Sequence, residues 1–273
     1  MSGVPSGGFC QRRRSFVRFV STASDSVVPV GVVDADEFMI EFVGMDGEVR
    51  CEPLARCGGV RFEEVAPARA FPMFKGQRNF PGRWWSSTVG RHVGYESWLE
   101  CEHVMLLDFD PAVVGIASQP FWLSWPHAGG VRRHLPDYFV RVKDGTGLVI
   151  DVRPDERVKA RDAEAFAVTA AACRTVGWRF RRVGVVESVF AANVRWLSRY
   201  RHPRCGRRED VTARLLEVFA QPAPLFEGAE RAGDRLLVLP VLFHLLWRHV
   251  LTGDLVGALL GPATVVRASG SSW

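Results

Sequence analysis

The sequence predicts a mixed α/β fold, because helical and strand-like segments alternate through its middle. The helical segments repeat apolar residues every three or four positions, whereas the strand-like segments are short apolar runs bounded by turn residues. The predicted order is a helix at 94–107, strands at 113–119, 121–125, 138–142 and 148–152, a helix at 159–176, a strand at 178–183 and a helix at 188–200. This order indicates helices layered on a sheet.

The composition is that of an ordinary globular protein. Of 273 residues, 47% are hydrophobic and 24% are charged, which excludes a mostly disordered or fibrous chain. The net charge of +5 permits an anionic partner without requiring one. Lysine occurs only at positions 75, 143 and 159, so 32 of the 35 basic residues are arginine.

We expect a cytoplasmic protein that makes no contact with a membrane. The first 18 residues contain basic residues and glycine but no apolar core of a signal peptide. The longest apolar stretch, 236–247, is too short to cross a bilayer. The six cysteines form no CxxC pair, so neither a zinc site nor a disulfide framework is indicated.

Both ends of the chain differ in character from the middle. We expect a flexible basic tail at 1–35, a small β element at 36–75 with strands at 38–43, 48–53 and 61–65, and a polar linker or loop at 75–92. After Pro203, helices at 210–220 and 238–250 flank a Pro- and Gly-rich loop at 221–234. Residues 205–266 are therefore predicted to form a small helical domain, for which a helix-turn-helix is one possible type.

Asp151 lies inside an apolar strand. Alternation along residues 147–154 places Val149, Asp151 and Arg153 on one face. A carboxylate in such a strand is costly unless something pairs with it. A simple strand-end salt bridge with Arg153 is the alternative interpretation for this pair taken alone.

Asp137 follows Pro136, which lacks an N–H and belongs at the start or edge of a strand. Asp137 is therefore expected at the mouth of the sheet. It shares a face with Asp151 only if the connecting loop has odd length or carries a bulge, and Gly147 is suited to the bulge position. Taken alone, Asp137 is more often a turn carboxylate.

The first predicted helix carries Glu96 and Glu100, which are four residues apart and hence on one face. Alone, they are typical of a solvated acidic stripe. Carboxylates gathered with Asp137 and Asp151 at one sheet edge would repel one another unless a cation neutralised them. Oxygen ligands of this kind suit Mg²⁺ or Mn²⁺, and such an ion can activate water to attack a phosphodiester.

Five short motifs follow one another between residues 97 and 154. They are Ser97-Trp98-Leu99-Glu100, Leu107-Asp108-Phe109-Asp110-Pro111, Gln119-Pro120-Phe121, Leu135-Pro136-Asp137-Tyr138-Phe139 and Asp151-Val152-Arg153-Pro154. As an ordered set they resemble the PD-(D/E)xK nuclease core, and more closely the TnsA-like endonuclease subunits of heteromeric transposases. The resemblance covers roughly residues 90–200 and implies a nuclease domain at 90–202.

The resemblance implies a restriction-endonuclease-like fold, a mixed sheet flanked by helices. It also implies a Mg²⁺-dependent (or Mn²⁺-dependent) endonuclease that hydrolyses phosphodiester bonds of double-stranded DNA at transposon ends. Such a subunit works beside a DDE-type transposase subunit and an ATPase regulator. By position, Glu100, Asp137 and Asp151 would be the metal ligands, with Glu96 as the alternative helix carboxylate. A winged-helix domain often follows the nuclease in such families.

Arg153 stands where the family pattern has lysine. Arginine remains charged and cannot act as a base, although it can clamp a phosphate and stabilise the transition state. Three readings stay open: activation of water by the metal suffices, Lys159 reaches back as an auxiliary base, or the subunit is slow or inactive. The alternative function is therefore a catalytically weak or inactive nuclease-fold subunit that binds DNA and assembles the same machinery.

Residues 174–214 are strongly basic, with eleven arginines against three acidic residues, a net charge of +8 (11 − 3). This excess predicts a surface that contacts DNA phosphates. The candidate DNA-binding residues are Arg179, Arg181, Arg182, Arg195, Arg199 and Arg201. The alternative is an arginine-rich solvated face without a partner, and the plainest rival is a basic regulator in which the acidic spacing is coincidence.

Overall fold

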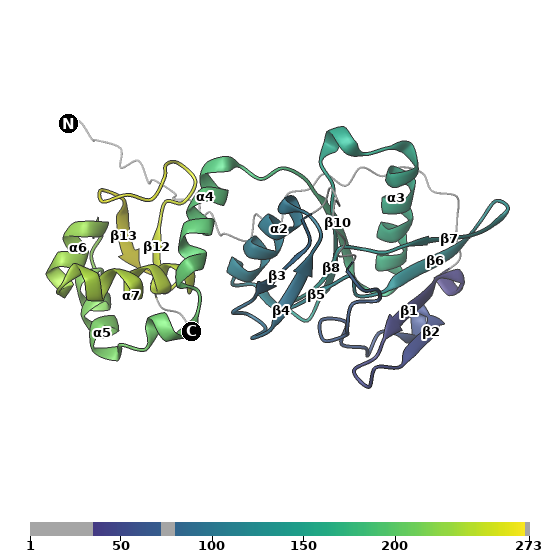
Figure 1. The fold of residues 1–273 in the computed structure, drawn as a ribbon, viewed down its shortest axis with the longest axis horizontal. Coiled ribbons are helices and arrows are strands. Elements are labelled where there is room, and N and C mark those ends of the chain that lie inside the picture. Colours follow the sequence, from purple (N-terminus) through teal and green to yellow (C-terminus); the bar gives the residue numbers. More distant parts are fainter. Residues whose placement is uncertain (1–34, 72–79, 271–273) are drawn as a thin grey trace, which may run out of the picture.

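The computed structural model describes residues 35–71 and 80–270. Figure 1 shows an elongated molecule in which the C-terminal helices and strands, green to yellow, lie at one end, and the larger sheets with α2 and α3 lie at the other. The predicted basic tail, apart from its last residue, and positions 75–79 of the predicted linker lie outside the described residues.

The central sheet has the strand order β10-β9-β8-β5. Its strands are β5 (Val113–Ser118), β8 (Tyr138–Val142), β9 (Gly147–Val152) and β10 (Arg179–Val183). Neighbouring strands are antiparallel except β9 and β10, which are parallel. A parallel pair needs a crossover connection, and helix α3 (Ala160–Thr175) supplies it. The mixed α/β prediction is thus confirmed for this layer.

Two helices cover the two faces of the central sheet. Helix α2 (Trp98–Phe109) packs Val104 and Leu107 against the face that carries Tyr138 and Ile150. Helix α3 packs on the opposite face, which carries Phe139 and Val149. Figure 1 shows the two helices on either side of β10 and β8. The strands are buried on both faces, which explains why β9 reads as a nearly continuous apolar run.

A second sheet has the order β2-β1-β6-β7. Its strands are β1 (Met39–Val43), β2 (Val49–Pro53), β6 (Trp122–His127) and β7 (Gly130–His134). The N-terminal hairpin therefore continues into β6 and β7, and the run at 121–125 does not join the central sheet as its position between predicted strands suggested. The chain leaves the central sheet at Gln119, whose φ of 46° turns it before Pro120.

The predicted third N-terminal strand at 61–65 is wrong. These residues form turns, joined to the hairpin only by the isolated bridge between Val43 and Ala66. Their apolar character comes from packing instead, because Phe62 is fully buried and its ring contacts Phe42, Phe121 and Trp178. A short apolar run does not distinguish a strand from a buried turn.

The described part of the predicted linker, from residue 80 to 92, is largely a hairpin. Strand β3 (Gly82–Trp85) pairs with β4 (His92–Tyr95), and both precede α2. The first helix consequently begins at Trp98 rather than at Gly94. Ser97 is the N-cap that sets this start, because its hydroxyl accepts a hydrogen bond from the backbone N–H of Glu100.

The C-terminal unit combines three helices with a small sheet of order β11-β13-β12. Its elements are α5 (Glu209–Val218), β11 (Ala223–Pro224), α6 (Leu225–Ala232), α7 (Arg235–Trp247), β12 (Leu251–Gly253) and β13 (Val265–Ala268). The predicted loop at 221–234 is wrong, since α6 occupies most of it. Pro224 and Gly233 bound this helix, and Gly228 inside it lies against the ring of Phe219.

One hydrophobic cluster joins the C-terminal unit to the central sheet's helix. It contains Met105, Leu106 and Phe109 of α2, Val194 and Leu197 of α4 (Ser188–Leu197), and Leu242 and Leu246 of α7. Helix α2 therefore buries residues on two sides, one against the sheet and one against the C-terminal unit. Among the described residues, no helix has both the length and the apolar character needed to cross a bilayer.

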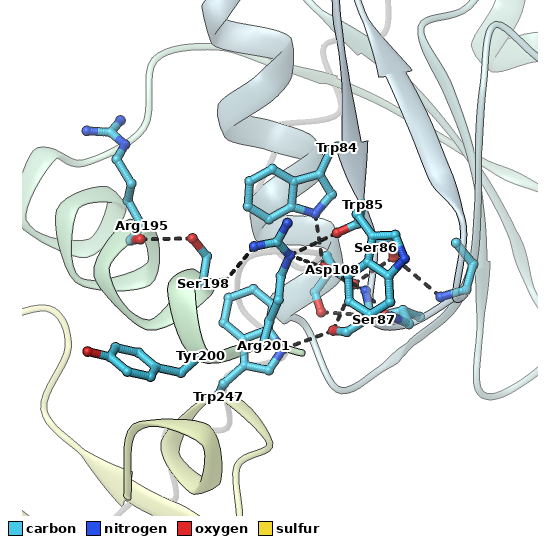
Figure 2. A network of polar contacts seen from close by, with 12 residues as sticks. Trp84, Trp85, Ser86, Ser87, Asp108, Arg195, Ser198, Tyr200, Arg201 and Trp247 are labelled. Carbon is cyan, nitrogen blue, oxygen red and sulfur yellow. Dashed lines mark hydrogen bonds and ion pairs between the residues drawn. The ribbon is translucent and has the colours of Figure 1, made fainter. Parts of the chain in front are cut away.

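Asp108 of α2 is the centre of a buried polar network shown in Figure 2. Its carboxylate accepts hydrogen bonds from Trp84 Nε1 at 3.0 Å, Ser86 Oγ at 2.6 Å, Ser87 N at 3.1 Å and Thr88 N at 2.8 Å. The side chain is fully buried. These donors satisfy both oxygens and hold the β3–β4 loop on α2.

Arg201 and Trp247 connect this network to the C-terminal elements. The Arg201 guanidinium lies 4.1 Å from the Trp84 ring centre, and its Nε donates to the Trp85 carbonyl at 2.8 Å. Trp247 at the end of α7 donates its Nε1 hydrogen to Ser87 Oγ at 3.1 Å. Figure 2 shows these side chains converging on the β3–β4 loop.

We predict that Asp108→Asn lowers the free energy of unfolding by about 2–3 kcal/mol, because an amide NH₂ then faces N–H and O–H donors inside the network. Chemical denaturation measures the change. Glu102→Gln is the matched control on the same helix, since it removes a single ion pair whose partner, Arg195, is exposed, and we expect it to cost less than about 1 kcal/mol. Equal losses in the two variants would contradict this account.

Candidate metal centre

Asp137 and Asp151 face each other across two neighbouring strands. The register pairs Tyr138 with Ile150, which places the preceding Asp137 opposite Asp151 and on the same face. Asp137 Oδ2 accepts a hydrogen bond from the backbone N–H of Val152 at 2.7 Å. The two carboxylates therefore belong to one site, where β8 begins and β9 ends.

The loop between β8 and β9 explains this register. Val142 pairs with Thr146 through a backbone hydrogen bond of 3.0 Å, which leaves a loop of odd length. Gly145 closes the loop with a φ of 86°, so the bulge position falls there and not at Gly147 as predicted. Gly147 is instead a residue of β9. A Cβ atom at this position would lie only 2.8 Å from the side chains of Phe139 and Trp178, so the close packing requires glycine.

Asp151 is almost fully buried and is paired with a histidine. His134, the last residue of β7, places its Nε2 atom 2.8 Å from Asp151 Oδ2. Burial is the largest single effect on His134 and lowers its pKa. The negative charge of Asp151 and its hydrogen bond act in the opposite direction, and together they raise the pKa above its usual value. The partner of Asp151 is thus His134 rather than the Arg153 considered in the strand-end salt bridge.

The Glu100 side chain folds back on the residues that start α2. Its Oε1 atom accepts from the Ser97 hydroxyl at 2.8 Å, and its Oε2 atom accepts from the backbone N–H of Glu96 at 2.8 Å. Tyr138, beside Asp137, donates its hydroxyl to the Glu100 carbonyl at 3.3 Å. The helix terminus that carries Glu100 is therefore attached to the strand that follows Asp137.

Glu96 lies before the helix, so the prediction that it shares a helical face with Glu100 is wrong. The N-cap at Ser97 is the reason, because residues before an N-cap leave the helical path. Glu96 Oε2 pairs with Arg69 at 2.7 Å. Its other oxygen, Oε1, is buried without a hydrogen-bond partner among the described residues.

The carboxylates influence one another's ionisation. The pKa of Asp137 is raised well above its usual range, first by burial and then by the negative charges of Asp151 and Glu100. The pKa of Glu100 is also raised, first by burial and further by Glu96, while the Arg153 guanidinium acts in the opposite direction. The protein has gathered three acidic groups close enough to repel one another, which favours a bound cation.

The donor set fits a hard divalent ion such as Mg²⁺ or Mn²⁺, because every candidate ligand is a carboxylate oxygen. Within residues 35–71 and 80–270, no three His, Cys, Asp or Glu side chains are already arranged as a closed metal-binding group. Both oxygens of Glu100 accept hydrogen bonds from Ser97 and Glu96. Asp137 and Asp151 are thus the two candidates that the fold itself holds face to face.

Residues 110–183 match the family model described as TnsA-like endonuclease N terminal. Over these residues the chain is similar to the N-terminal domain of TnsA-like endonucleases. The matched span runs from the end of α2 to β10 and contains Asp137, Asp151 and Arg153. Glu100 precedes it. A comparison with curated proteins finds no match for the chain.

The TnsA-like domain contains the Gln119-Pro120-Phe121 motif at the same end of the sheet as the acidic pair. Gln119 is buried, and its backbone N–H donates to the Asp137 carbonyl at 2.8 Å. A positive φ is uncommon for glutamine, and here it lets the backbone at residue 119 fix the position of Asp137. The motif therefore supports the acidic pair through the backbone.

The two basic candidates near the acidic pair occupy different positions. Arg153 is exposed, and its backbone N–H bonds to the Val183 carbonyl of β10 at 2.8 Å. Its charge acts on Glu100, Asp137 and His134. Lys159 is exposed at the N-cap of α3, where its backbone N–H bonds to Asp162 at 3.2 Å.

The arginines of β10 do not share one face. Strand alternation places Arg179 and Arg181 on one side and Arg182 on the other. Arg182 pairs with Asp155 at 2.6 Å and donates to the Arg153 carbonyl at 2.9 Å, while Arg179 lies 3.8 Å from Asp144. The strand therefore does not present its three guanidinium groups as a single surface.

The remaining predicted DNA-binding arginines lie on α4 and just after it. Arg195 pairs with Glu102 of α2, and Arg199 lies with its guanidinium 4.8 Å from the Trp196 ring centre. Both side chains are exposed. Arg201 is largely buried in the Asp108 network, where it contributes to packing between the two ends of the molecule.

His134 is the residue at this site that the sequence interpretation did not include. Its signal was its position three residues before Asp137, in a polar stretch that reads as a turn rather than as strand β7. Arg132, Arg133 and His134 obscure the strand pattern because β7 is a sheet edge, where one side of the strand faces solvent.

We predict that Asp137→Asn stabilises the metal-free protein by about 1 kcal/mol or more at neutral pH, because it removes a like charge but keeps an acceptor for the Val152 N–H. A folded-state pKa above the unfolded value makes the Asp137 contribution favourable at low pH and removes it as pH rises through the folded pKa. The advantage of the variant over wild type should therefore grow with pH.

Thermal and chemical denaturation in the presence of a chelator, from about pH 4 to pH 8, measure this difference. Asp155→Asn is the control, because Asp155 is an exposed carboxylate in an ion pair with Arg182, and we expect a change within about 1 kcal/mol. A variant that is less stable than wild type at every pH would show that the carboxylates do not repel one another.

Proposed function

We propose that this protein is a Mg²⁺-dependent DNA endonuclease subunit of a heteromeric transposase, which hydrolyses phosphodiester bonds at transposon ends. The observation that carries the proposal is the pairing of Asp137 with Asp151 inside a TnsA-like endonuclease domain. A DDE-type transposase subunit and an ATPase regulator are the partners that this family context supports. The TnsA-like domain also supports a restriction-endonuclease-like fold for the segment from α2 to β10.

In this proposal Asp137 and Asp151 hold the metal ion, and Glu100 completes the ligand set. Asp151 lies in β9, and Asp137, directly before β8, is held beside it by the hydrogen bond from the Val152 N–H, so we expect their separation to change little when an ion binds. Glu100 must give up its hydrogen bonds with Ser97 and Glu96 to reach the ion. The helix N-terminus allows this, because the Ser97 hydroxyl still caps it. A bound Mg²⁺ or Mn²⁺ polarises the phosphodiester and lowers the pKa of a coordinated water.

Arg153 takes the role of phosphate clamp. It is exposed next to the acidic cluster and retains its charge at all working pH values. A guanidinium can bind two phosphate oxygens at once and stabilise the charge that develops as the bond to the leaving group breaks. It does not accept the proton of the attacking water.

The C-terminal unit has the element order of a winged helix, helix–strand–helix–helix followed by two strands. Its third helix, α7, is mostly buried between the other elements, and Arg235 is its only Lys, Arg, Asp or Glu. We therefore assign DNA contact to the basic side chains around the nuclease domain, among them Arg153, Arg195 and Arg199, and assign packing and assembly to α7.

We predict that wild type nicks a plasmid that carries transposon ends when Mg²⁺ or Mn²⁺ and the partner transposase are present. Asp137→Ala and Asp151→Asn should each lose at least about a hundredfold in rate, because a missing carboxylate leaves the cation weakly held. Asp155→Asn, an exposed carboxylate four residues from Asp151, should cleave at the wild-type rate. If wild type and Asp137→Ala gave the same product yield under every condition, the proposal that this protein is a nuclease would be excluded.

The second candidate function is a DNA-binding and assembly subunit without nuclease activity, which the arginine at position 153 favours. Both candidates share the fold and the DNA surface. Salt-dependent DNA binding that persists in Asp137→Ala, combined with no cleavage by wild type, would select the assembly subunit over the nuclease.

The role of Arg153 can be tested separately. We predict that Arg153→Ala reduces the cleavage rate by about 10²- to 10³-fold, since it removes a charge from the transition state. Arg153→Lys should keep a large part of the activity, because the positive charge remains beside the cluster. Measuring both rates against pH is the control: a rate that rises with pH in Arg153→Lys but not in wild type would show that lysine, but not arginine, serves as a base.

A further inference from the structure

We propose that His134 is a positioning residue that orients the Asp151 carboxylate for metal binding. The inference deepens the proposed function and rests on it, because Asp151 is one of the proposed metal ligands. His134 belongs to the second sheet, whereas Asp151 belongs to the central sheet. The contact between them is therefore built by tertiary structure and not by neighbouring positions on one element.

The chain path places His134 at the junction of the two sheets. Strand β7 ends at His134, and only Leu135, Pro136 and Asp137 separate it from β8. The same short segment thus carries both the proposed ligand Asp137 and the histidine that contacts the other ligand, Asp151. Pro136 is buried and restricts the backbone between them.

The imidazole is enclosed on more than one side. Only 17% of the His134 side chain and 4% of the Asp151 side chain are exposed. The ring of Phe166 in α3 meets the imidazole edge to face, with 5.9 Å between ring centres. A ring held in this way has few orientations, so its Nε2 hydrogen is directed at Asp151 Oδ2 across 2.8 Å.

This hydrogen bond gives the two oxygens of the Asp151 carboxylate different roles. An ionised carboxylate only accepts hydrogen bonds, so the histidine nitrogen is the donor. With Oδ2 held by His134, Oδ1 remains for the cation, and the plane of the carboxylate is fixed. Partners of this kind orient metal ligands in many proteins, and their loss commonly weakens metal affinity by about 10–100-fold.

We assign the histidine a role through Asp151, because its Nε2 atom is bonded to that carboxylate and only 17% of its side chain is exposed. This distinguishes it from the auxiliary base considered for Lys159. His127 offers a matched control on the adjoining strand, since it lies 3.4 Å from Glu164 and away from the acidic pair.

The test is Mn²⁺ binding by the full-length protein, measured by electron paramagnetic resonance and by calorimetry without DNA. We expect His134→Ala to weaken Mn²⁺ affinity about 10–100-fold. His134→Gln should restore most of the affinity, because its amide N–H can occupy the Nε2 position. His127→Ala should bind as wild type does. Circular dichroism melts identify any variant that fails to fold. If His134→Ala does so, His134→Phe replaces it, because it keeps a ring against Phe166 but has no N–H for Asp151, and we expect the same loss of about 10–100-fold.

The outcomes separate this inference from the proposed function. If Asp151→Asn loses Mn²⁺ binding while His134→Ala and His134→Gln both bind as tightly as wild type, the role of His134 is overturned and the metal centre stands. If wild type does not bind Mn²⁺, or Asp151→Asn binds it unchanged, the metal centre and the role of His134 both fail. Weak binding by His134→Ala with recovery in His134→Gln supports the positioning role.

Discussion

The repulsion between Asp137 and Asp151 is the constraint on which the site depends. Strand pairing between β8 and β9 holds the two carboxylates face to face, and the register is set by the loop that Gly145 closes. Such an arrangement raises the free energy of the metal-free protein, so it is retained at a cost to stability. Two neighbours offset part of this cost. His134 forms a hydrogen bond with Asp151, and the positive charge of Arg153 acts on Asp137.

Helix α2 links this site to the rest of the molecule. Its first turn carries Glu100 beside the acidic pair, its middle packs on the central sheet, and Asp108 near its end organises the network with Arg201 and Trp247. A displacement of the C-terminal unit would therefore act on the same helix that carries a proposed ligand.

The sequence predicted the central sheet well because its strands are buried on both faces and its helices carry clear signals. It also predicted that Asp137 and Asp151 lie side by side, and the TnsA-like resemblance is matched over residues 110–183. It did not predict that residues 121–125 leave the central sheet, since the turn depends on the unusual backbone of Gln119. It placed Glu96 on a helix because the N-cap at Ser97 was not recognised. The His134–Asp151 contact joins two sheets, so no local pattern reveals it. Arg201 was read from charge alone, whereas its burial follows from packing against Trp84.

The central claim is that these separated carboxylates share one divalent ion. Diffraction from crystals soaked in Mn²⁺, recorded near the manganese absorption edge, locates such an ion directly. The account predicts an anomalous peak in contact with Asp137 and with the Asp151 oxygen that His134 leaves free, with Glu100 turned toward it. A peak elsewhere on the protein, or electron density that separates the two aspartates onto opposite faces of the sheet, would contradict it.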